Sequence, residues 1–140
     1  MAITDPDPRA ARADVELRLP ADGAYVSVLR TTTAALAARL DFTLDDIEDL
    51  RIAVGEACSM VLPAADLGAS LDVSFFLALD RISVSVSVPS ATPLAPDYEA
   101  FGWQVLETLA TSTSVETSGG RFTVTFTVHS TLGAIPEADV

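Results

Sequence analysis

Three segments of the chain place an apolar residue at every second position. They span residues 71–79, 82–88 and 122–128, and in the last two every intervening residue is serine or threonine. Successive side chains of a β-strand point to opposite faces of a sheet, so each segment predicts a strand with one apolar face. A sheet built from such strands needs a cover on one side only. The chain is therefore predicted to form a sheet with a single buried face.

Two more strands and three helices complete the pattern. The first helix carries an apolar stripe of Tyr25, Leu29, Leu36 and Leu40, and Thr43 has the position of an N-cap for the second helix. The predicted elements are a strand at 15–19, helices at 24–40 and 43–62, strands at 71–79 and 82–88 joined by an Asp80–Arg81 turn, a helix at 97–110, a short strand at Val115 and a strand at 122–128.

The order βααββαββ predicts an α+β two-layer sandwich, with a mainly antiparallel sheet and helices on one face. We expect one domain over residues 15–129. Residues 1–14 contain two Asp-Pro steps without periodicity and are expected to form a mobile arm, and residues 130–140 form a C-terminal tail.

The net charge and the single cysteine and histidine limit the classes of function that this chain can have. With 20 acidic residues against 8 arginines and no lysine, the net charge of −12 disfavours nucleic acid as a partner and favours a basic protein. We find no apolar run that predicts a signal peptide or a membrane span. Cys58 is the only cysteine and fits a reduced cytoplasm, and His129, the only histidine, is expected to be an ordinary surface residue.

The face of the second helix opposite its core stripe mixes acidic and apolar residues. Asp49, Ile52, Glu56 and Met60 share this face at helical spacing. Two interpretations remain open, a solvated surface or a face covered by a ligand, a loop or a partner.

The stretch Asp49–Met60, DLRIAVGEACSM, resembles the N-box helix of anti-sigma factors that double as serine-protein kinases within the GHKL ATPase superfamily. The stretch Phe101–Val115, FGWQVLETLATSTSV, resembles the last glycine box of that family and the helix and strand that follow it. The resemblance extends over about residues 15–128 and is to the divergent actinobacterial type. It implies the GHKL fold, which agrees with the predicted order of elements.

Carried over residue by residue, the resemblance implies an altered nucleotide site. Glu56 matches the glutamate that activates the attacking hydroxyl or water, whereas Met60 stands where the family has the asparagine that holds magnesium. Only Gly102 remains of the last glycine box, with Ala100 at the earlier position. The segment 88–96, VPSATPLAP, lacks the aspartate and glycine of the adenine box and is short for a nucleotide lid. We expect no bound cofactor or metal, with Met60 and Gly102 marking a degenerate site.

The resemblance implies an anti-sigma factor that sequesters an RNA polymerase sigma factor and is released by an anti-anti-sigma antagonist. One alternative is an active serine kinase that phosphorylates this antagonist with ATP and magnesium, using Glu56 as base, so enzymatic activity is left open. Another is a non-catalytic scaffold of the same fold with a different protein partner. The family also implies a homodimer, and the single cysteine indicates the cytoplasm.

Four residues are candidates for partner binding. Arg30 matches an arginine that the family uses at its partner surface, and no acid lies three or four residues away from it on the helix. Asp45 and Asp49 either offset the helix dipole or attract a basic sigma segment. Trp103 is either part of the core or an anchor for a partner.

Overall fold

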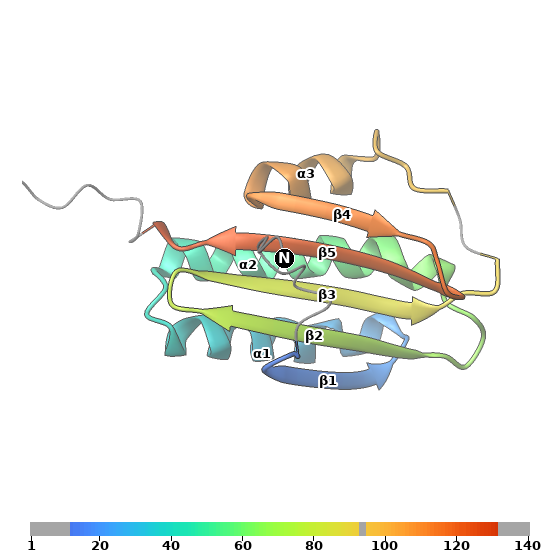
Figure 1. Ribbon diagram of the computed structural model, residues 1–140, viewed down its shortest axis with the longest axis horizontal. Coiled ribbons are helices and arrows are strands. Elements are labelled where there is room, and N and C mark those ends of the chain that lie inside the picture. Colours follow the sequence, from blue (N-terminus) through green and yellow to red (C-terminus); the bar gives the residue numbers. More distant parts are fainter. Residues whose placement is uncertain (1–11, 93–94, 132–140) are drawn as a thin grey trace, which may run out of the picture.

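The computed structural model describes residues 12–92 and 95–131 (Figure 1). Five strands form one sheet in the order β1-β2-β3-β5-β4, and all neighbouring strands are antiparallel. The strands are β1 (Val15–Pro20), β2 (Ser70–Ala78), β3 (Arg81–Pro89), β4 (Ser112–Glu116) and β5 (Arg121–His129). The helices are α1 (Val26–Arg39), α2 (Leu44–Val61) and α3 (Phe101–Leu109), with short 3₁₀ turns at Gly23–Tyr25 and Leu62–Ala64. The predicted α+β fold and order of elements are confirmed.

The alternating apolar positions form the buried face of the sheet. On β2, β3 and β5 they are Leu71, Val73, Phe75, Ile82, Val84, Val86, Val88, Phe122, Val124, Phe126 and Val128, all buried. They belong to one cluster with residues from all three helices, among them Leu29, Leu50 and Leu106. Figure 1 shows α1 and α2 together behind the sheet, with α3 next to β4. Helix packing on one face therefore creates the single core that the pattern predicts.

Several details differ from the prediction. Tyr25 and Leu79 were expected in the core but are 39% and 90% exposed, because Tyr25 precedes α1 and Leu79 lies in the turn after β2 ends. The buried stripe of α1 consists instead of Leu29, Thr33 and Ala37.

Helix α3 begins at Phe101 rather than near Asp97. The Asp97 carboxylate accepts a hydrogen bond from Glu99 N (3.1 Å), and the Asp97 carbonyl accepts one from Ala100 N (3.2 Å). These bonds close a turn in front of the helix, which is the local alternative to helix that aspartate favours.

A tight joint sets the angle between α1 and α2. Asp41 has a left-handed backbone (φ 60°), and the N–H groups of Asp41 and Phe42 donate to the carbonyls of Ala38 and Ala37, the Schellman arrangement at a helix end. Thr43 then caps α2 as predicted, accepting a hydrogen bond from Asp46 N at 3.1 Å. This short connection places α1 and α2 side by side.

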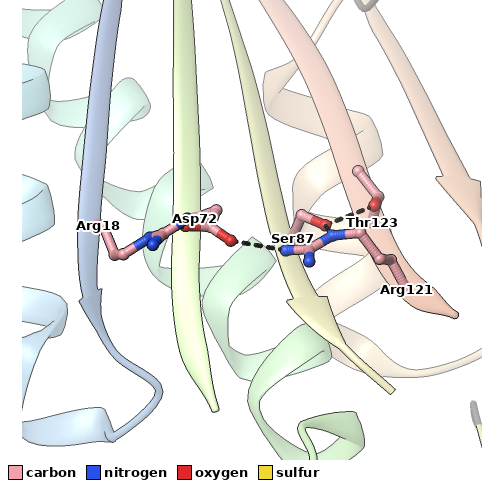
Figure 2. Close-up of polar contacts among 5 residues, drawn as sticks. All are labelled: Arg18, Asp72, Ser87, Arg121 and Thr123. Atoms are coloured by element: carbon pink, nitrogen blue, oxygen red, sulfur yellow. Dashed lines mark hydrogen bonds and ion pairs between the residues drawn. The ribbon is translucent and has the colours of Figure 1, made fainter. Parts of the chain in front are cut away.

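The open face of the sheet carries a polar network across four strands (Figure 2). Asp72 accepts hydrogen bonds from Arg18 Nε and Arg121 Nη2, both at 2.8 Å. Arg121 Nε also donates to Ser87 Oγ, which shares a hydrogen bond with the Thr123 hydroxyl, again at 2.8 Å. One carboxylate thus neutralises two arginines, and the hydrogen bond with Asp72 raises the pKa of Arg18.

The ends of the described chain are attached to the fold. Asp14 N donates to Phe75 O (2.9 Å), and Leu77 N donates to the Asp14 carboxylate (2.8 Å), so contacts with the sheet begin just before β1. Thr131 binds Asp46 on α2. The rest of the predicted arm and tail, residues 1–11 and 132–140, lies outside the described residues.

Candidate functional site

Helix α2 packs against α1 on one side and α3 on the other, and it carries Glu56 and Met60. Figure 1 shows this arrangement, with α2 between the other two helices. Arg30 and Glu56 line a hollow on the α1 side of α2, and Met60 and Trp103 line one on the α3 side.

A charged groove lies between α1 and α2. Its lining consists of Arg30 from α1 and Glu48, Arg51, Ile52 and Glu56 from α2. Arg51 and Glu48 form an exposed ion pair at 3.7 Å. Arg30 is exposed, and within the described part of the chain no carboxylate lies within ion-pair distance of its guanidinium. Among the described residues, the groove therefore presents the Arg30 guanidinium without an ion-pair partner, and this group can be offered to another protein.

The Arg30 guanidinium lies against Gly55, the residue before Glu56. A Cβ at position 55 would lie 2.5 Å from Arg30 Nη2 and 3.0 Å from Nε. Only a glycine leaves room for the side chain in this position. Gly55 is not among the site residues predicted from the sequence, because a glycine within a helical pattern does not reveal which side chain from another helix will contact it.

An apolar pocket of about 210 Å³ lies on the other side of α2, against α3. Met60 and Trp103 line it, with Tyr98, Val115 and Phe122 among the other walls. Among the described residues that line it, only Asp97 is charged. Trp103 is only 5% exposed, and its ring meets that of Tyr98 edge-to-face with centroids 5.0 Å apart. Trp103 is thus part of the core, and it also lines this pocket.

Glu56 and Gly102 are brought together at the first turn of α3. A Cβ on Gly102 would lie 2.5 Å from Glu56 Oε2, so glycine makes room for the half-buried carboxylate. The N-cap of α3, Ala100, provides no side-chain hydrogen bond. A negative charge near a helix N-terminus is favourable, which accounts for the carboxylate lying there. Glu56 and Gly102 are therefore neighbours, and Met60 lies one turn further along α2 from Glu56.

Among the acidic residues at the start of α2, Asp46 has a structural role. Asp46 is buried, and its carboxylate accepts hydrogen bonds from Thr131 N (3.0 Å) and Thr131 Oγ1 (2.8 Å). Burial by itself would raise the pKa of Asp46, but these bonds and those from Thr43 outweigh burial and lower it. Asp45 is exposed and Asp49 half-buried, and neither lines the groove or the pocket. Burial, and then the charges of Asp46, Asp45 and Glu48, raise the pKa of Asp49.

The remaining chemically distinctive residues lie apart from both hollows. Cys58 is buried, and burial raises the pKa of its thiol to about 12, although the positive charge of Arg30 acts to lower this pKa. The thiol therefore stays protonated at neutral pH. His129 is exposed and shares a hydrogen bond with the Thr111 hydroxyl at 2.8 Å.

Within residues 12–92 and 95–131, no three His, Cys, Asp or Glu side chains converge on a metal position. No helix in these ranges is both long and apolar enough to cross a membrane.

Comparison with known proteins finds several relatives that are named serine-protein kinase RsbW. The serine-protein kinase RsbW of Halalkalibacterium halodurans is 43% identical over 74 residues, which are 52% of this chain and 46% of the relative. The serine-protein kinase RsbW of Bacillus cereus is 38% identical over 76 residues, 52% of this chain and 47% of the relative. Over this half of its length, the chain is similar to the RsbW serine-protein kinases. It spans about half the length of the curated RsbW relatives that it matches.

The fold of an RsbW domain is also recognised in the structure. The crystal structure of the RsbU and RsbW domains of Rv1364c from Mycobacterium tuberculosis superimposes with a TM-score of 0.66 at 19% identity, covering 81% of this chain and 31% of that one. This likeness supports the fold and not the activity. No protein-family model matches the sequence. The family resemblance and the GHKL-type fold expected from the sequence are confirmed.

Proposed function

We propose that this chain is an anti-sigma factor, which binds and sequesters an RNA polymerase sigma factor and releases it when an anti-anti-sigma protein competes. The observation that carries the proposal is homology to the RsbW proteins. The charged α1–α2 groove supports it by presenting Arg30 for a protein contact. Asp45 and Asp49 add negative charge at the start of α2 for a basic segment of the sigma factor.

We further propose that the nucleotide site of the family is degenerate. The α2–α3 pocket presents a Met60 thioether, a soft and weak ligand, where a magnesium site needs hard oxygen donors. The charged side chain among its described lining residues is the Asp97 carboxylate, which repels phosphates. The side chains that line this pocket therefore do not fit a magnesium nucleotide, and no step of the proposed function uses one.

The alternative is an active serine kinase acting on the anti-anti-sigma protein. It is favoured by the name of the relatives and by the position of Glu56 against the first turn of α3. In that case Glu56 would serve as the base, and ATP with magnesium would be the cofactor.

Two experiments separate these possibilities. Co-purification from the native cell, followed by mass spectrometry, should recover a sigma factor. Recovery of an unrelated protein alone would favour the non-catalytic scaffold with a different protein partner. Calorimetry with ATP and magnesium at millimolar concentration should give weak or undetectable binding. Micromolar binding would overturn the degenerate site and favour the kinase.

The proposal includes a homodimer, as the family resemblance implies, and a cytoplasmic location, as the single cysteine indicates. Light scattering coupled to gel filtration measures the mass of the purified chain. A mass equal to that of one chain at every concentration tested would remove the dimer from the proposal without affecting sigma-factor binding.

A further inference from the structure

Gly55 forms part of the α1–α2 interface beneath the Arg30 side chain. The three heavy atoms nearest to a Cβ at this position all belong to Arg30, namely Nη2 at 2.5 Å, Nε at 3.0 Å and Cζ at 3.2 Å. Real Cβ atoms essentially never lie closer than 3.0 Å to another heavy atom that is not bonded to them or next to them in the chain. The guanidinium thus occupies the space that the side chain of any other residue would need.

The fold itself gives no reason for glycine here. Glycine is among the least favourable residues in a helix interior and alanine the most favourable. Gly55 lies within α2, and its φ is not in the left-handed region. The atoms that obstruct a Cβ are the end of one flexible, exposed side chain, which can move away without disturbing the core.

We propose that Gly55 is a positioning residue, which holds the Arg30 guanidinium in the groove for a carboxylate of the protein partner. The planar guanidinium can donate two parallel hydrogen bonds to the two oxygens of one carboxylate. Holding it in place before binding reduces the conformational entropy lost when the complex forms. This inference rests on the proposed function, because it assumes that Arg30 contacts the partner.

The test compares Gly55→Ala, Arg30→Ala and the double variant, with Gly23→Ala as control, since a Cβ at Gly23 meets nothing within 4 Å. The probe is the sigma factor recovered by co-purification, purified and fluorescently labelled. We expect Gly55→Ala to weaken binding by roughly 10-fold or more, as loss of an interface hot spot does. The double variant should bind no more weakly than Arg30→Ala alone, and Gly23→Ala should bind like the native chain.

Stability moves in the opposite direction, which distinguishes positioning from general damage. Because alanine favours the helix, Gly55→Ala should melt at the same or a higher temperature than the native chain. Affinity that falls while the melting temperature holds or rises is the expected signature. Native affinity in Gly55→Ala, together with weakened binding in Arg30→Ala, overturns the inference.

A measurement without the partner separates this inference from the proposed function. The side-chain Nε–H resonance of Arg30, assigned by its loss in Arg30→Ala, should shift in Gly55→Ala and not in Gly23→Ala. If the resonance shifts but Arg30→Ala binds normally, the proposed partner contact fails and position 55 has no role in recognition. An unmoved resonance overturns the inference whatever the affinity.

Discussion

The two sides of α2 contrast in chemistry although they belong to one helix. Towards α1 the groove is lined by Arg30, Glu48, Arg51 and Glu56, all charged, with Ile52. Towards α3 the pocket is mainly apolar, and its described lining includes a buried tryptophan and the charged Asp97. The α1 side can form directional contacts with a protein surface, and the α3 side mainly adds to the core. We infer that recognition and stability are divided between the two sides.

The largest effect should come from the apolar side. Trp103→Ala should destabilise the fold by about 3–5 kcal/mol, because it removes a buried aromatic side chain and leaves a cavity beside Leu106 and Phe122. Urea unfolding followed by far-UV circular dichroism measures this, since the variant loses the only tryptophan. Trp103→Phe, which keeps an aromatic ring, should lose less. A loss below about 1 kcal/mol for Trp103→Ala would place this residue outside the structural core.

The next effect should come from the charged side and appear in binding instead. Arg30→Ala should weaken sigma-factor binding by about 2 kcal/mol with little change in melting temperature, as expected for an exposed interface hot spot. A titration with labelled sigma factor, run beside a melting curve, measures both quantities. Arg39→Ala, which removes another exposed arginine of α1, is the matched control. Equal affinity of the native chain and Arg30→Ala would move the contact surface away from this groove.

The contrast also marks how far sequence reasoning extends. Alternation and helical spacing determine which side of each element is buried, so the sheet, the three helices and the neighbours Glu56 and Met60 could be predicted. Contacts between residues distant in sequence could not, because no local pattern encodes them. The Gly55–Arg30 contact and the bond from Thr131 to Asp46 join residues 25 and 85 positions apart, and only the packed fold brings them together.

A smaller effect concerns the acidic start of α2, where Asp46 and Asp45 should behave differently. Asp46→Asn should cost about 1–2 kcal/mol of stability, because Thr131 loses a charged acceptor. Asp45→Asn, at an exposed position, should stay within about 0.5 kcal/mol of the native chain. Thermal unfolding of both variants at neutral pH measures the difference.

The pH dependence follows from the lowered pKa of Asp46. A carboxylate whose pKa is lower in the folded than in the unfolded state stabilises the fold above the unfolded pKa, and this contribution is lost as the pH falls through the folded value. The stability gap between the native chain and Asp46→Asn should therefore be full near neutral pH and should close below about pH 4. A gap that persists at lower pH would show that the side-chain ionisation is not its source.

The smallest effect should be that of Glu56→Ala on partner binding, although Glu56 is the residue that most strongly resembles a catalytic group. Its carboxylate lies at the first turn of α3, so removing it should reduce stability by roughly 0.3–1 kcal/mol, the usual contribution of an acid near a helix N-terminus. Affinity for the sigma factor should stay within about 0.5 kcal/mol of the native value, because Arg30 and its support on Gly55 are unchanged. The same titration used for Arg30→Ala measures this.

If Glu56→Ala instead weakens binding as much as Arg30→Ala does, recognition is not confined to Arg30, and the division between the two sides of α2 does not hold. If binding is intact but phosphate transfer to the anti-anti-sigma protein is detected and then lost in this variant, the kinase alternative replaces the degenerate site.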